Sequence, residues 1–474
     1  MIPITLAEVC AAVGGELVGD GATVVTGITI DSRSVAPGDL FVAFAGERSD
    51  GHDFASAALA QGAAAVMSQR PVAEPAVVVA DPLAAVGRLA TALLQRLPQL
   101  TTIGVTGSSG KTSTKDLLAQ VLAPSGPTIA PVGSFNNELG LPLTALRSDA
   151  DTRFLVLEMG ARGRGHIAYL CGIAPLDVGV VLNVGSAHVG EFGGQEQIAA
   201  AKSEIVAGLS PAGLAVLNAD DPLVAAMRQG TQAGRVLTFG ESAGADVRIA
   251  GLRLDGMARA SFDLRFEGDT AHVALQLAGE HMALNAAAAA TVAVGLGISL
   301  QDAADRLSSA TARSPWRMEV TTTDGGVTVI NDAYNANPES MRAALKALVA
   351  MARGGEGEDP GRSWAVLGEM LELGDESRTA HDAIGRLAVR LDVSRLVAVG
   401  EGARPIHMGA AHEGSWGDES AWVADADAAV ELLAAELRPG DVVLVKASRA
   451  GGLERVAAAI IDLDPAARAD GSDA

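Results

Sequence analysis

A glycine-rich segment that ends in Gly-Lys-Thr is the clearest chemical signal in the sequence. An expected strand at residues 102–105 runs into Gly-Ser-Ser-Gly, then Lys111 and Thr112, and a helix is expected at residues 113–122. The N–H groups of such a loop bind phosphate, the lysine supplies charge to the β- and γ-phosphates, and the threonine hydroxyl suits Mg²⁺. The strict motif has glycine where this chain has Val105, and a turn without a ligand is the alternative. The context favours a nucleoside triphosphate site formed by Gly107, Ser108, Ser109, Gly110, Lys111, Thr112 and Ser113.

Polar groups follow the neighbouring expected strands. Glu158 comes directly after the run at 154–157, and His188 lies in the loop after the run at 178–182. Because ligands bind beyond the carboxyl ends of the strands in open α/β sheets, these groups are expected beside the loop. Each residue alone could have a structural role instead. Glu158 could cap a helix, and His188 could form structural hydrogen bonds. With a Gly-Lys-Thr loop and the polar turn at 134–140, they favour metal and phosphate binding.

Lys202 lies within an apolar stripe of an expected helix at residues 196–209, together with Ile198, Val206 and Leu209. The spacing alone favours a side chain that extends along this stripe to solvent. The other interpretation is a buried amine, whose pKa desolvation would lower. A neutral amine can react with CO₂, and the resulting carbamate would be a carboxylate-like ligand for Mg²⁺.

A second group of candidates comes from the last third of the chain. Arg317 could reach a γ-phosphate from the neighbouring domain, with a solvated surface arginine as the alternative. Asp332, Tyr334 and Asn335 follow an expected strand and are candidates for ribose, adenine or phosphate contacts. Lys446 and Ser448 come at the end of another strand, where a cation could bind an anion.

Three blocks of alternating strands and helices must position these groups. We expect an N-terminal domain at 1–98, a central domain at 99–315 and a C-terminal domain at 316–474. The repeated strand–loop–helix order predicts α/β domains with a parallel central sheet. The expected strands lie at 24–30, 40–44, 76–79, 102–105, 154–157, 178–182, 215–217, 327–330, 365–367, 396–399 and 442–445. Further helices are expected at 54–61 and 84–97.

Composition excludes several classes of protein. Among the 474 residues, Lys and Arg number 35 and Asp and Glu 57, and the resulting net charge of −22 argues against a nucleic-acid-binding surface. Two cysteines, Cys10 and Cys171, do not make a disulfide framework and fit a reducing cytosol. The apolar stretch at 282–298 is mostly small residues and contains Asn285, which argues against membrane insertion. The first residues carry no basic segment typical of a signal peptide, and we expect a cytoplasmic protein and a monomer.

The motifs, taken in order, resemble those of the Mur ligases, the ATP-dependent amide-forming enzymes of peptidoglycan precursor synthesis. The matching segments are Asp31, Ser32 and Arg33, then residues 50–54, 107–113, 136–142, 157–161, 183–188 and 201–205, His281 with Asn285, and residues 316–319, 332–338 and 446–449. The resemblance is greatest to the branch that adds D-alanyl-D-alanine to UDP-N-acetylmuramoyl-tripeptide. It implies an N-terminal domain for the UDP-sugar, a central P-loop ATPase-like domain and a C-terminal Rossmann-like domain that closes over ATP.

The resemblance also implies a mechanism and roles for residues. A substrate carboxylate attacks the γ-phosphoryl group of ATP to give an acyl phosphate, and the incoming amine then displaces phosphate. Lys111 and Thr112 would hold the phosphates and a first Mg²⁺ with Glu158, while His188 and a carbamylated Lys202 would hold a second Mg²⁺. The resemblance thereby reverses the preference for a solvent-reaching Lys202. The implied catalytic residues are Lys111, His188, Lys202 and Arg317.

The remaining implied roles concern binding. The implied nucleotide-binding residues outside the loop are Asn137, His281, Asn285, Arg317, Asp332 and Asn335, of which His281 could equally be a structural helix residue. The implied substrate-binding residues are Asp31, Ser32 and Arg33 near the UDP, with Lys446 and Ser448.

Two other classes of protein compete with this hypothesis. One is a ligase of the same superfamily with another acceptor, such as a folylpolyglutamate synthetase, which would not be expected to carry the segments at 31–33 and 50–54. The other is a non-catalytic nucleotide-binding module or a simple ATPase. In a protein of that class, Arg317, Asp332 and Lys446 of a second Rossmann-like block would have no role.

Overall fold

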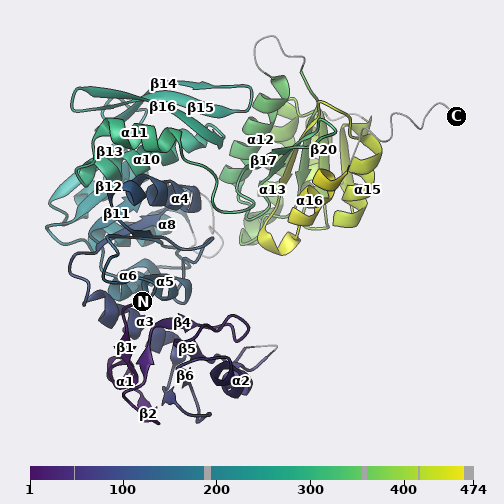
Figure 1. The fold of residues 1–474 in the computed structure, drawn as a ribbon. Helices are drawn as coiled ribbons and strands as arrows, with labels where there is room; N and C mark the ends of the chain where they lie inside the picture. Colours follow the sequence, from purple (N-terminus) through teal and green to yellow (C-terminus); the bar gives the residue numbers. More distant parts are fainter. Residues whose placement is uncertain (47–48, 186–193, 355–359, 415–416, 464–474) are drawn as a thin grey trace.

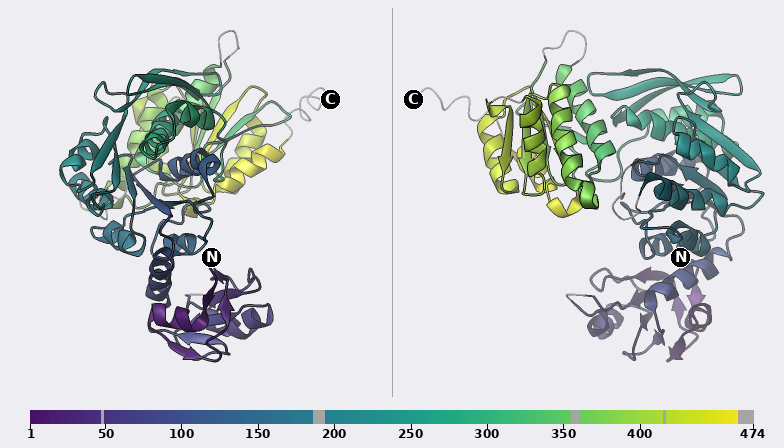
Figure 2. Two further views of the ribbon diagram at one scale, coloured as in Figure 1. Left: turned by 60° about the vertical axis from the view of Figure 1, so that its left-hand side comes forward. Right: turned by 180° about the vertical axis from the view of Figure 1, so that it is seen from behind.

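The computed structural model describes residues 1–46, 49–185, 194–354, 360–414 and 417–463. Three α/β domains follow one another along the chain, each around its own sheet (Figure 1). The N-terminal domain lies at one end of the molecule, and the C-terminal domain lies beside the central one (Figures 1 and 2). Helix α3 (Pro82–Leu94) packs against α1 (Leu6–Val13) of the first domain and α5 (Gly140–Ala145) of the second, and so joins the two.

The N-terminal domain contains a five-stranded sheet of order β2-β7-β6-β5-β4 and a separate β1-β3 pair. Its strands are β1 Ile4–Thr5, β2 Glu16–Val18, β3 Val24–Val25, β4 Gly27–Thr29, β5 Asp39–Val42, β6 Ala65–Ser68 and β7 Ala76–Val78, and its other helices are the 3-10 helix η1 Gly51–Phe54 and α2 Ala55–Ala60. The expectation of one strand at 24–30 is wrong. At Thr26 the chain leaves β3, which pairs with β1, and the N–H of Thr26 donates to the carbonyl of Gly38. The next strand, β4, then pairs with β5 in the other sheet.

The central domain contains a nine-stranded sheet of order β16-β15-β14-β13-β12-β11-β8-β10-β9. Its strands are β8 Thr101–Thr106, β9 Thr128–Ile129, β10 Phe154–Glu158, β11 Val178–Val181, β12 Leu214–Asn218, β13 Arg235–Gly240, β14 Val247–Leu254, β15 Arg259–Phe266 and β16 Asp269–Ala278. The expected strands of this block are confirmed within one residue, and they are parallel. Beyond this parallel part, β14, β15 and β16 form an antiparallel meander, which was not predicted from the sequence. The residues of β16 alternate between buried and exposed, as they do when one face of an antiparallel sheet meets water.

The helices of the central domain cover its sheet. They are α4 Lys111–Leu122, the 3-10 helix η2 Ala123–Ser125, α5, α6 His166–Ile173, α8 Gln195–Ala207, α9 Pro222–Ala226, the 3-10 helix η3 Met227–Gln229, α10 His281–Gly295 and α11 Leu300–Ser308. Helix α4 begins at Lys111, two residues before the expected start. The alanine-rich α10 is almost wholly buried against α4, and its small side chains permit this close packing.

The C-terminal domain contains a six-stranded sheet of order β17-β18-β22-β19-β20-β21, parallel except for the edge strand β17. Its strands are β17 Glu319–Thr322, β18 Thr328–Asn331, β19 Ser363–Leu367, β20 Arg395–Val399, β21 Ser420–Val423 and β22 Val442–Lys446. Its helices are α12 Pro338–Arg353, α13 Ser377–Arg390, α14 Arg404–Glu413, α15 Ala426–Glu436 and α16 Glu454–Asp462, with short 3-10 helices η4 Gly374–Glu376, η5 Gly417–Glu419 and η6 Arg449–Gly451. The expected strands of this block are confirmed within two residues.

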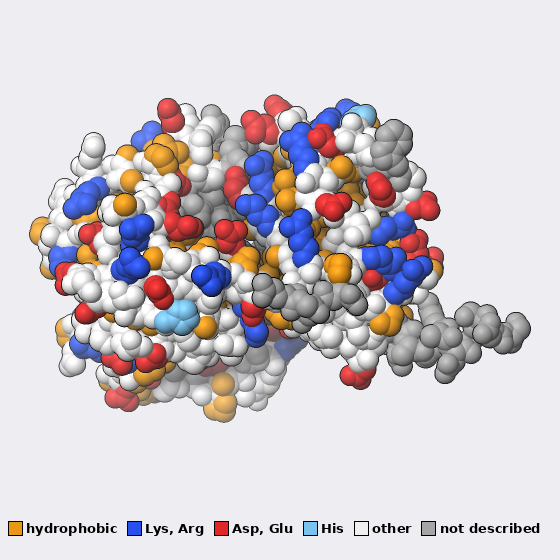
Figure 3. Space-filling view, turned by 90° about the horizontal axis from the view of Figure 1, so that it is seen from above, with side chains coloured by type: hydrophobic (Ala, Val, Ile, Leu, Met, Phe, Trp, Pro, Cys, Tyr) orange, Lys and Arg blue, Asp and Glu red, His pale blue; other side chains and the backbone are white. Residues whose placement is uncertain are grey.

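Acidic and basic side chains are interspersed over the face seen from above (Figure 3), unlike the single basic face of a nucleic-acid-binding protein. No helix among the described residues is long and apolar enough to span a membrane.

Candidate active site

A cavity of about 520 Å³ lies between the central and C-terminal domains, and most of the predicted site residues line it. These are Ser108, Ser109, Gly110, Lys111, Thr112, Ser113, Asn137, Glu158, Lys202, His281, Asn285, Arg317, Asp332, Asn335 and Lys446. The parallel sheet explains part of this convergence, because β8 pairs with both β10 and β11 and their carboxyl ends meet at one edge. His188 lies outside the described residues.

The phosphate loop connects β8 to α4. Gly110 has a φ of +81°, and a Cβ at this position would lie 2.5 Å from Oδ1 of Asn285, so glycine is required here both by conformation and by space. The Lys111 ammonium donates a hydrogen bond of 2.7 Å to the carbonyl of Gly107. Burial lowers the pKa of Lys111, an effect that the nearby charge of Glu158 partly opposes. The loop therefore holds its lysine folded over its own backbone.

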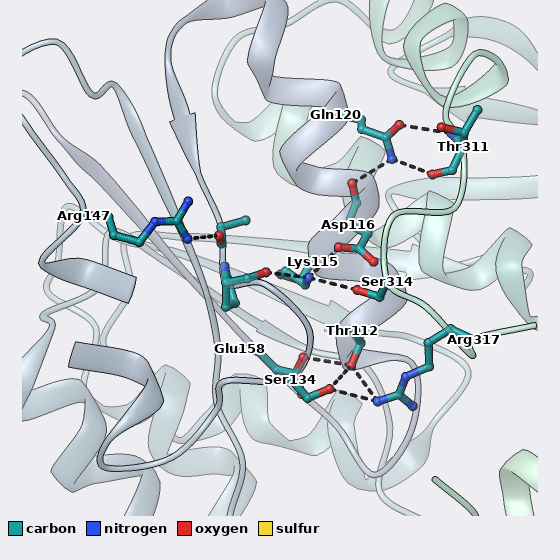
Figure 4. Close-up of polar contacts among 12 residues, drawn as sticks. Thr112, Lys115, Asp116, Gln120, Ser134, Arg147, Glu158, Thr311, Ser314 and Arg317 are labelled. Atoms are coloured by element: carbon teal, nitrogen blue, oxygen red, sulfur yellow. Dashed lines mark hydrogen bonds and ion pairs between the residues drawn. The ribbon is translucent and has the colours of Figure 1, made fainter. Parts of the chain in front are cut away.

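The hydroxyl of Thr112 lies at the centre of a polar cluster (Figure 4). It donates to Oε2 of Glu158 at 2.9 Å and lies 2.8 Å from Oγ of Ser134. Arg317 reaches this cluster from the start of the C-terminal domain, and its Nη2 donates to the Thr112 hydroxyl at 3.1 Å and to Ser134 at 2.9 Å. The other oxygen of Glu158 accepts a hydrogen bond of 2.8 Å from Asn136. A carboxylate and a hydroxyl, the oxygen ligands that Mg²⁺ prefers, are thus adjacent.

Lys202 lies on α8, and its side chain is buried, with a relative exposure of 4%. The expectation from spacing that it extends to solvent is wrong, because the stripe of α8 that carries it faces the protein interior and the cavity. Within the described part of the chain its amine has no hydrogen bond or ion pair. Burial first, and then the charge of Lys111, lowers its pKa well below the ordinary value. The environment of Lys202 therefore favours the neutral amine.

The C-terminal domain contributes a buried ion pair. Lys446 at the end of β22 lies 2.6 Å from Oδ2 of Asp332, which follows β18, and it also donates to the carbonyl of Asn335 at 2.8 Å. Burial lowers the pKa of Lys446, although the charge of Asp332 opposes this effect. Asn337, which caps α12, donates to the carbonyl of Ser108 at 3.3 Å. The C-terminal domain therefore contacts the phosphate loop directly.

Two buried nitrogen atoms at the site lack hydrogen-bond partners among the described residues, namely Nδ1 of His281 and Nε of Arg317. Burial lowers the pKa of His281 and so favours its neutral form. The guanidinium of Arg317 lies over the ring of Tyr334, 4.1 Å from its centroid. Both nitrogen atoms belong to residues that line the cavity.

Five predicted residues do not line the cavity. Gly107 contributes its carbonyl to Lys111, and Oγ of Ser448 accepts a hydrogen bond of 3.0 Å from the backbone of Leu371. Asp31, Ser32 and Arg33 lie in the N-terminal domain, after β4, where Arg33 forms an ion pair of 2.7 Å with Asp31. The hydrogen bonds from Arg33 lower the pKa of Asp31 to about 2.

Several cavity residues were not predicted from the sequence. Ser134 belongs to the polar turn at 134–140, which was the one signal for it. Arg162 and His166 follow β10 and both contact Glu138, at 3.3 and 3.2 Å. Arg449 stacks over the ring of Trp316, 4.2 Å from its centroid.

Asn137 was predicted to bind nucleotide, and its Oδ1 also accepts from the backbone N–H groups at the start of α5.

Three family models match the chain. One described as Mur ligase family, catalytic domain matches residues 24–95, the Mur ligase middle domain matches residues 105–293, and the Mur ligase, glutamate ligase domain matches residues 316–449. The matches follow the order of the three domains.

Curated relatives and solved structures agree with the family models. The UDP-N-acetylmuramoyl-tripeptide–D-alanyl-D-alanine ligase of Mycobacterium tuberculosis (strain H37Rv) is 50% identical over an alignment of 503 residues, which covers 97% of this chain and 98% of the relative. The enzyme of that name from Escherichia coli K12 is 33% identical and covers 97% and 99%. A crystal structure of MurF from Acinetobacter baumannii matches with a TM-score of 0.86 at 32% identity, covering 97% and 99%. A MurF ligase from Thermotoga maritima in complex with ADP matches with a TM-score of 0.79 at 32% identity, covering 94% and 99%. The chain therefore belongs to the Mur ligase family.

Proposed function

We propose that this protein joins D-alanyl-D-alanine to UDP-N-acetylmuramoyl-tripeptide with the hydrolysis of ATP, and so makes the UDP-muramoyl-pentapeptide of peptidoglycan synthesis. The observation that carries the proposal is the meeting of Lys111, Thr112 and Glu158 with Arg317 in one cavity between two domains. Relatives that are similar over nearly the whole chain have this activity in their names. Such a reaction belongs in the cytoplasm, where ATP is available, and we propose that the enzyme acts there as a monomer.

ATP would bind with its phosphates on the loop. The N–H groups of residues 108–112 and the N-terminus of α4 favour anions there. Lys111 would exchange the carbonyl of Gly107 for phosphate oxygens, and Arg317 would offer its unpartnered Nε. His281 and Asn285 on α10 would face the adenine, while Asp332 and Asn335 would face the ribose from the other domain.

The donor set fits magnesium. Thr112 and Glu158 would hold a first Mg²⁺ together with ATP. His188 and a carbamate on Lys202 would hold a second. Burial lowers the pKa of Lys202 and so favours the neutral amine, which is the form that reacts with CO₂. Bound Mg²⁺ neutralises the charge of the phosphates and lets an anionic carboxylate approach them.

The chain's own residues would then promote two displacements. In the first, a carboxylate oxygen of the tripeptide forms a bond to the γ-phosphorus, and the bond from phosphorus to ADP breaks. Lys111 and Arg317 stabilise the charge on the phosphoryl oxygens, and Arg317 is held for this by Tyr334 and Ser134. In the second, the amine of D-alanyl-D-alanine attacks the acyl carbon, loses a proton and expels phosphate with the original carboxylate oxygen.

The substrates would approach from two sides. The UDP portion would bind near Asp31, Ser32 and Arg33, of which Arg33 has an exposed side chain. Lys446 and Ser448, at the end of β22, would lie toward the peptide and dipeptide. The ion pair of Lys446 with Asp332 keeps this ammonium in a fixed position.

The test is phosphate release from ATP and Mg²⁺, measured with UDP-N-acetylmuramoyl-tripeptide and D-alanyl-D-alanine together and with each omitted. The proposal predicts release that needs both, with a product heavier than the tripeptide by the dipeptide less water. Release with the tripeptide and a different amine would assign another acceptor. Release with neither substrate would indicate a simple ATPase, and the Lys111→Ala variant controls for a contaminating enzyme.

A further inference from the structure

One face of α4 contacts the linker between the central and C-terminal domains, which comprises residues 311–318. Figure 4 shows side chains of this helix pointing to the linker at three successive levels. The contacting pairs are Thr112 with Arg317 at 3.1 Å, Lys115 with Ser314 at 3.4 Å, and Gln120 with Thr311 at 3.0 and 3.1 Å. The linker thus runs antiparallel to α4, with one contact at every third linker residue.

Lys115 is the central member of this face, and its side chain has a relative exposure of 1%. Its ammonium contacts three acceptors, which are Oδ1 of Asp116 at 2.5 Å, the carbonyl of Pro131 at 2.9 Å and Oγ of Ser314 at 3.4 Å. A buried ammonium destabilises a protein unless it is paired and hydrogen-bonded. The three acceptors meet this requirement, and in doing so they connect α4 to two other segments.

Those two segments carry the partners of the Thr112 hydroxyl. Pro131 comes three residues before Ser134, and Ser314 comes three residues before Arg317. Ser134 and Arg317 both contact the Thr112 hydroxyl and each other. Lys115, one helical turn beyond Thr112, therefore fixes both segments close to the point where they enter the nucleotide site.

Beyond Ser314, the linker is attached to the other domain. The N–H of Met318 donates to Asp332 at 3.1 Å, and the carbonyl of Trp316 accepts from Tyr334 at 3.3 Å. Trp316 and Met318 have φ values of +58° and +52°, a conformation that is strained for residues other than glycine. The chain therefore passes from the central to the C-terminal domain at residue 315. Ser314, on one side, is held by Lys115 of the central domain, and the strained residues Trp316 and Met318 lie on the other side.

We propose that Lys115 is a positioning residue for ligation. Through Pro131 and Ser314 it holds Ser134 and Arg317 at the Thr112 hydroxyl, so that Arg317 is already in place when the γ-phosphoryl group is transferred. The role in ligation rests on the proposed function, whereas the mechanical role of Lys115 in holding the linker does not. Lys115 itself acts through these residues and does not contact the reacting atoms.

The mechanical role is tested on the full chain without ligands by hydrogen exchange. In Lys115→Met, which keeps the length of the side chain and removes its hydrogen bonds, we expect the amides of residues 132–135 and of residues 311–318, except Pro315, to exchange about tenfold faster. Those of the distant α15 should be unchanged. Lys346→Met, which removes an exposed lysine of α12, is the matched control and should leave both segments as they are. Unchanged exchange at 311–318 in Lys115→Met would overturn the proposal.

The role in catalysis is tested by a double-mutant cycle with Arg317. We expect Lys115→Met to lower kcat for phosphate release about 10- to 100-fold, since small misplacements of a catalytic group have effects of this size. In an Arg317→Ala background the same substitution should lower kcat by a clearly smaller factor, because one of the two residues that Lys115 positions is gone. A full effect in that background would overturn the proposal. If Lys115→Met does not fold, Ser314→Ala, which removes one hydroxyl, must show the same dependence on Arg317. If the unmodified protein forms no amide, the proposed function fails and the exchange measurement still decides the mechanical role.

Discussion

Arg317 and Thr112 are 205 residues apart in the chain, yet Nη2 of Arg317 donates a hydrogen bond of 3.1 Å to the Thr112 hydroxyl. The first lies at the start of the C-terminal domain, just before β17, and the second follows the lysine of the phosphate loop. The two domains therefore meet at the atoms that would surround a γ-phosphate. A site assembled in this way depends on the relative position of the domains, which is set by the linker and by the contact of Asn337 with Ser108.

Replacing Arg317 should abolish most of the activity. Arginines that stabilise the charge of a transferring phosphoryl group contribute about 10³-fold or more to kcat, and we expect a loss of this order in Arg317→Ala. Arg317→Lys should also be impaired, because a lysine lacks the planar guanidinium that stacks over Tyr334 while its Nη2 donates to both Thr112 and Ser134. Steady-state phosphate release measures both variants. Arg313→Ala removes an exposed arginine of the same linker and should keep activity within about twofold. Comparable losses at both positions would contradict the role given to Arg317.

Lys202→Ala should abolish turnover while the protein stays folded. The variant removes the amine that would become a metal-binding carbamate, and a small carboxylate should partly replace it. We therefore expect formate or acetate to restore part of the activity in Lys202→Ala and to have no such effect on Lys111→Ala. Phosphate release with a series of carboxylate concentrations measures the rescue. Near-normal activity of Lys202→Ala without any additive would show that the carbamate is not required.

The stability of the C-terminal domain should depend on pH through His381. This buried histidine accepts a hydrogen bond of 2.8 Å from the N–H of Met370 at Nε2, and its Nδ1 lies 2.6 Å from the carbonyl of Ser377. Burial lowers its pKa below the usual 6.5. The unfolded chain therefore binds more protons than the folded one between the lowered pKa and 6.5, so that stability falls as the pH is lowered through this window.

The measurement is urea unfolding followed by tryptophan fluorescence. All four tryptophans of the chain lie in the C-terminal domain, so this signal reports on that domain. We expect the free energy of unfolding of the unmodified protein to fall relative to that of His381→Gln between about pH 7.5 and pH 5.5. A constant difference between the two proteins over this range would show that His381 does not titrate as described.

Nucleotide and UDP-substrate binding should bring the domains closer together. The ligands would contact residues of both sides of the cavity, and the linker offers a single passage between anchored segments at residue 315. Small-angle scattering with a non-hydrolysable ATP analogue and the UDP-tripeptide should therefore show a smaller radius of gyration. The Lys111→Ala protein should show a smaller change at the same concentrations. An unchanged scattering curve for the unmodified protein would argue against closure near residues 313–317.

Much of the site could be predicted because its residues are signalled locally. The phosphate loop is a continuous segment, and Glu158 is the last residue of β10, so strand order and the rule for parallel sheets suffice to bring them together. The position of Lys202 could not be predicted in this way. The same spacing on α8 fits a buried amine and one that reaches solvent, and the packing of other elements decides between them. The resemblance to a family predicted the buried position, which the structure shows.

Other features depend on contacts between distant segments. Ser134 contacts Thr112 because of the conformation of an irregular loop, for which the residue types give no rule. The antiparallel strands β14 to β16 are separated by short turns within a block dominated by strand–helix units. They were not recognised as strands because they do not follow that strand–helix pattern. The split of the expected strand at 24–30 likewise depends on which sheet each half joins.

The defining step of the proposed reaction is the attack of the tripeptide carboxylate on ATP before the amide forms. It is tested by supplying UDP-N-acetylmuramoyl-tripeptide labelled with ¹⁸O in its terminal carboxylate, together with ATP, Mg²⁺ and D-alanyl-D-alanine, and by mass analysis of the released phosphate. One labelled oxygen is expected in phosphate for every amide bond formed. Unlabelled phosphate, released at the same rate as the product, would contradict the acyl-phosphate route and the roles assigned to Lys111 and Arg317.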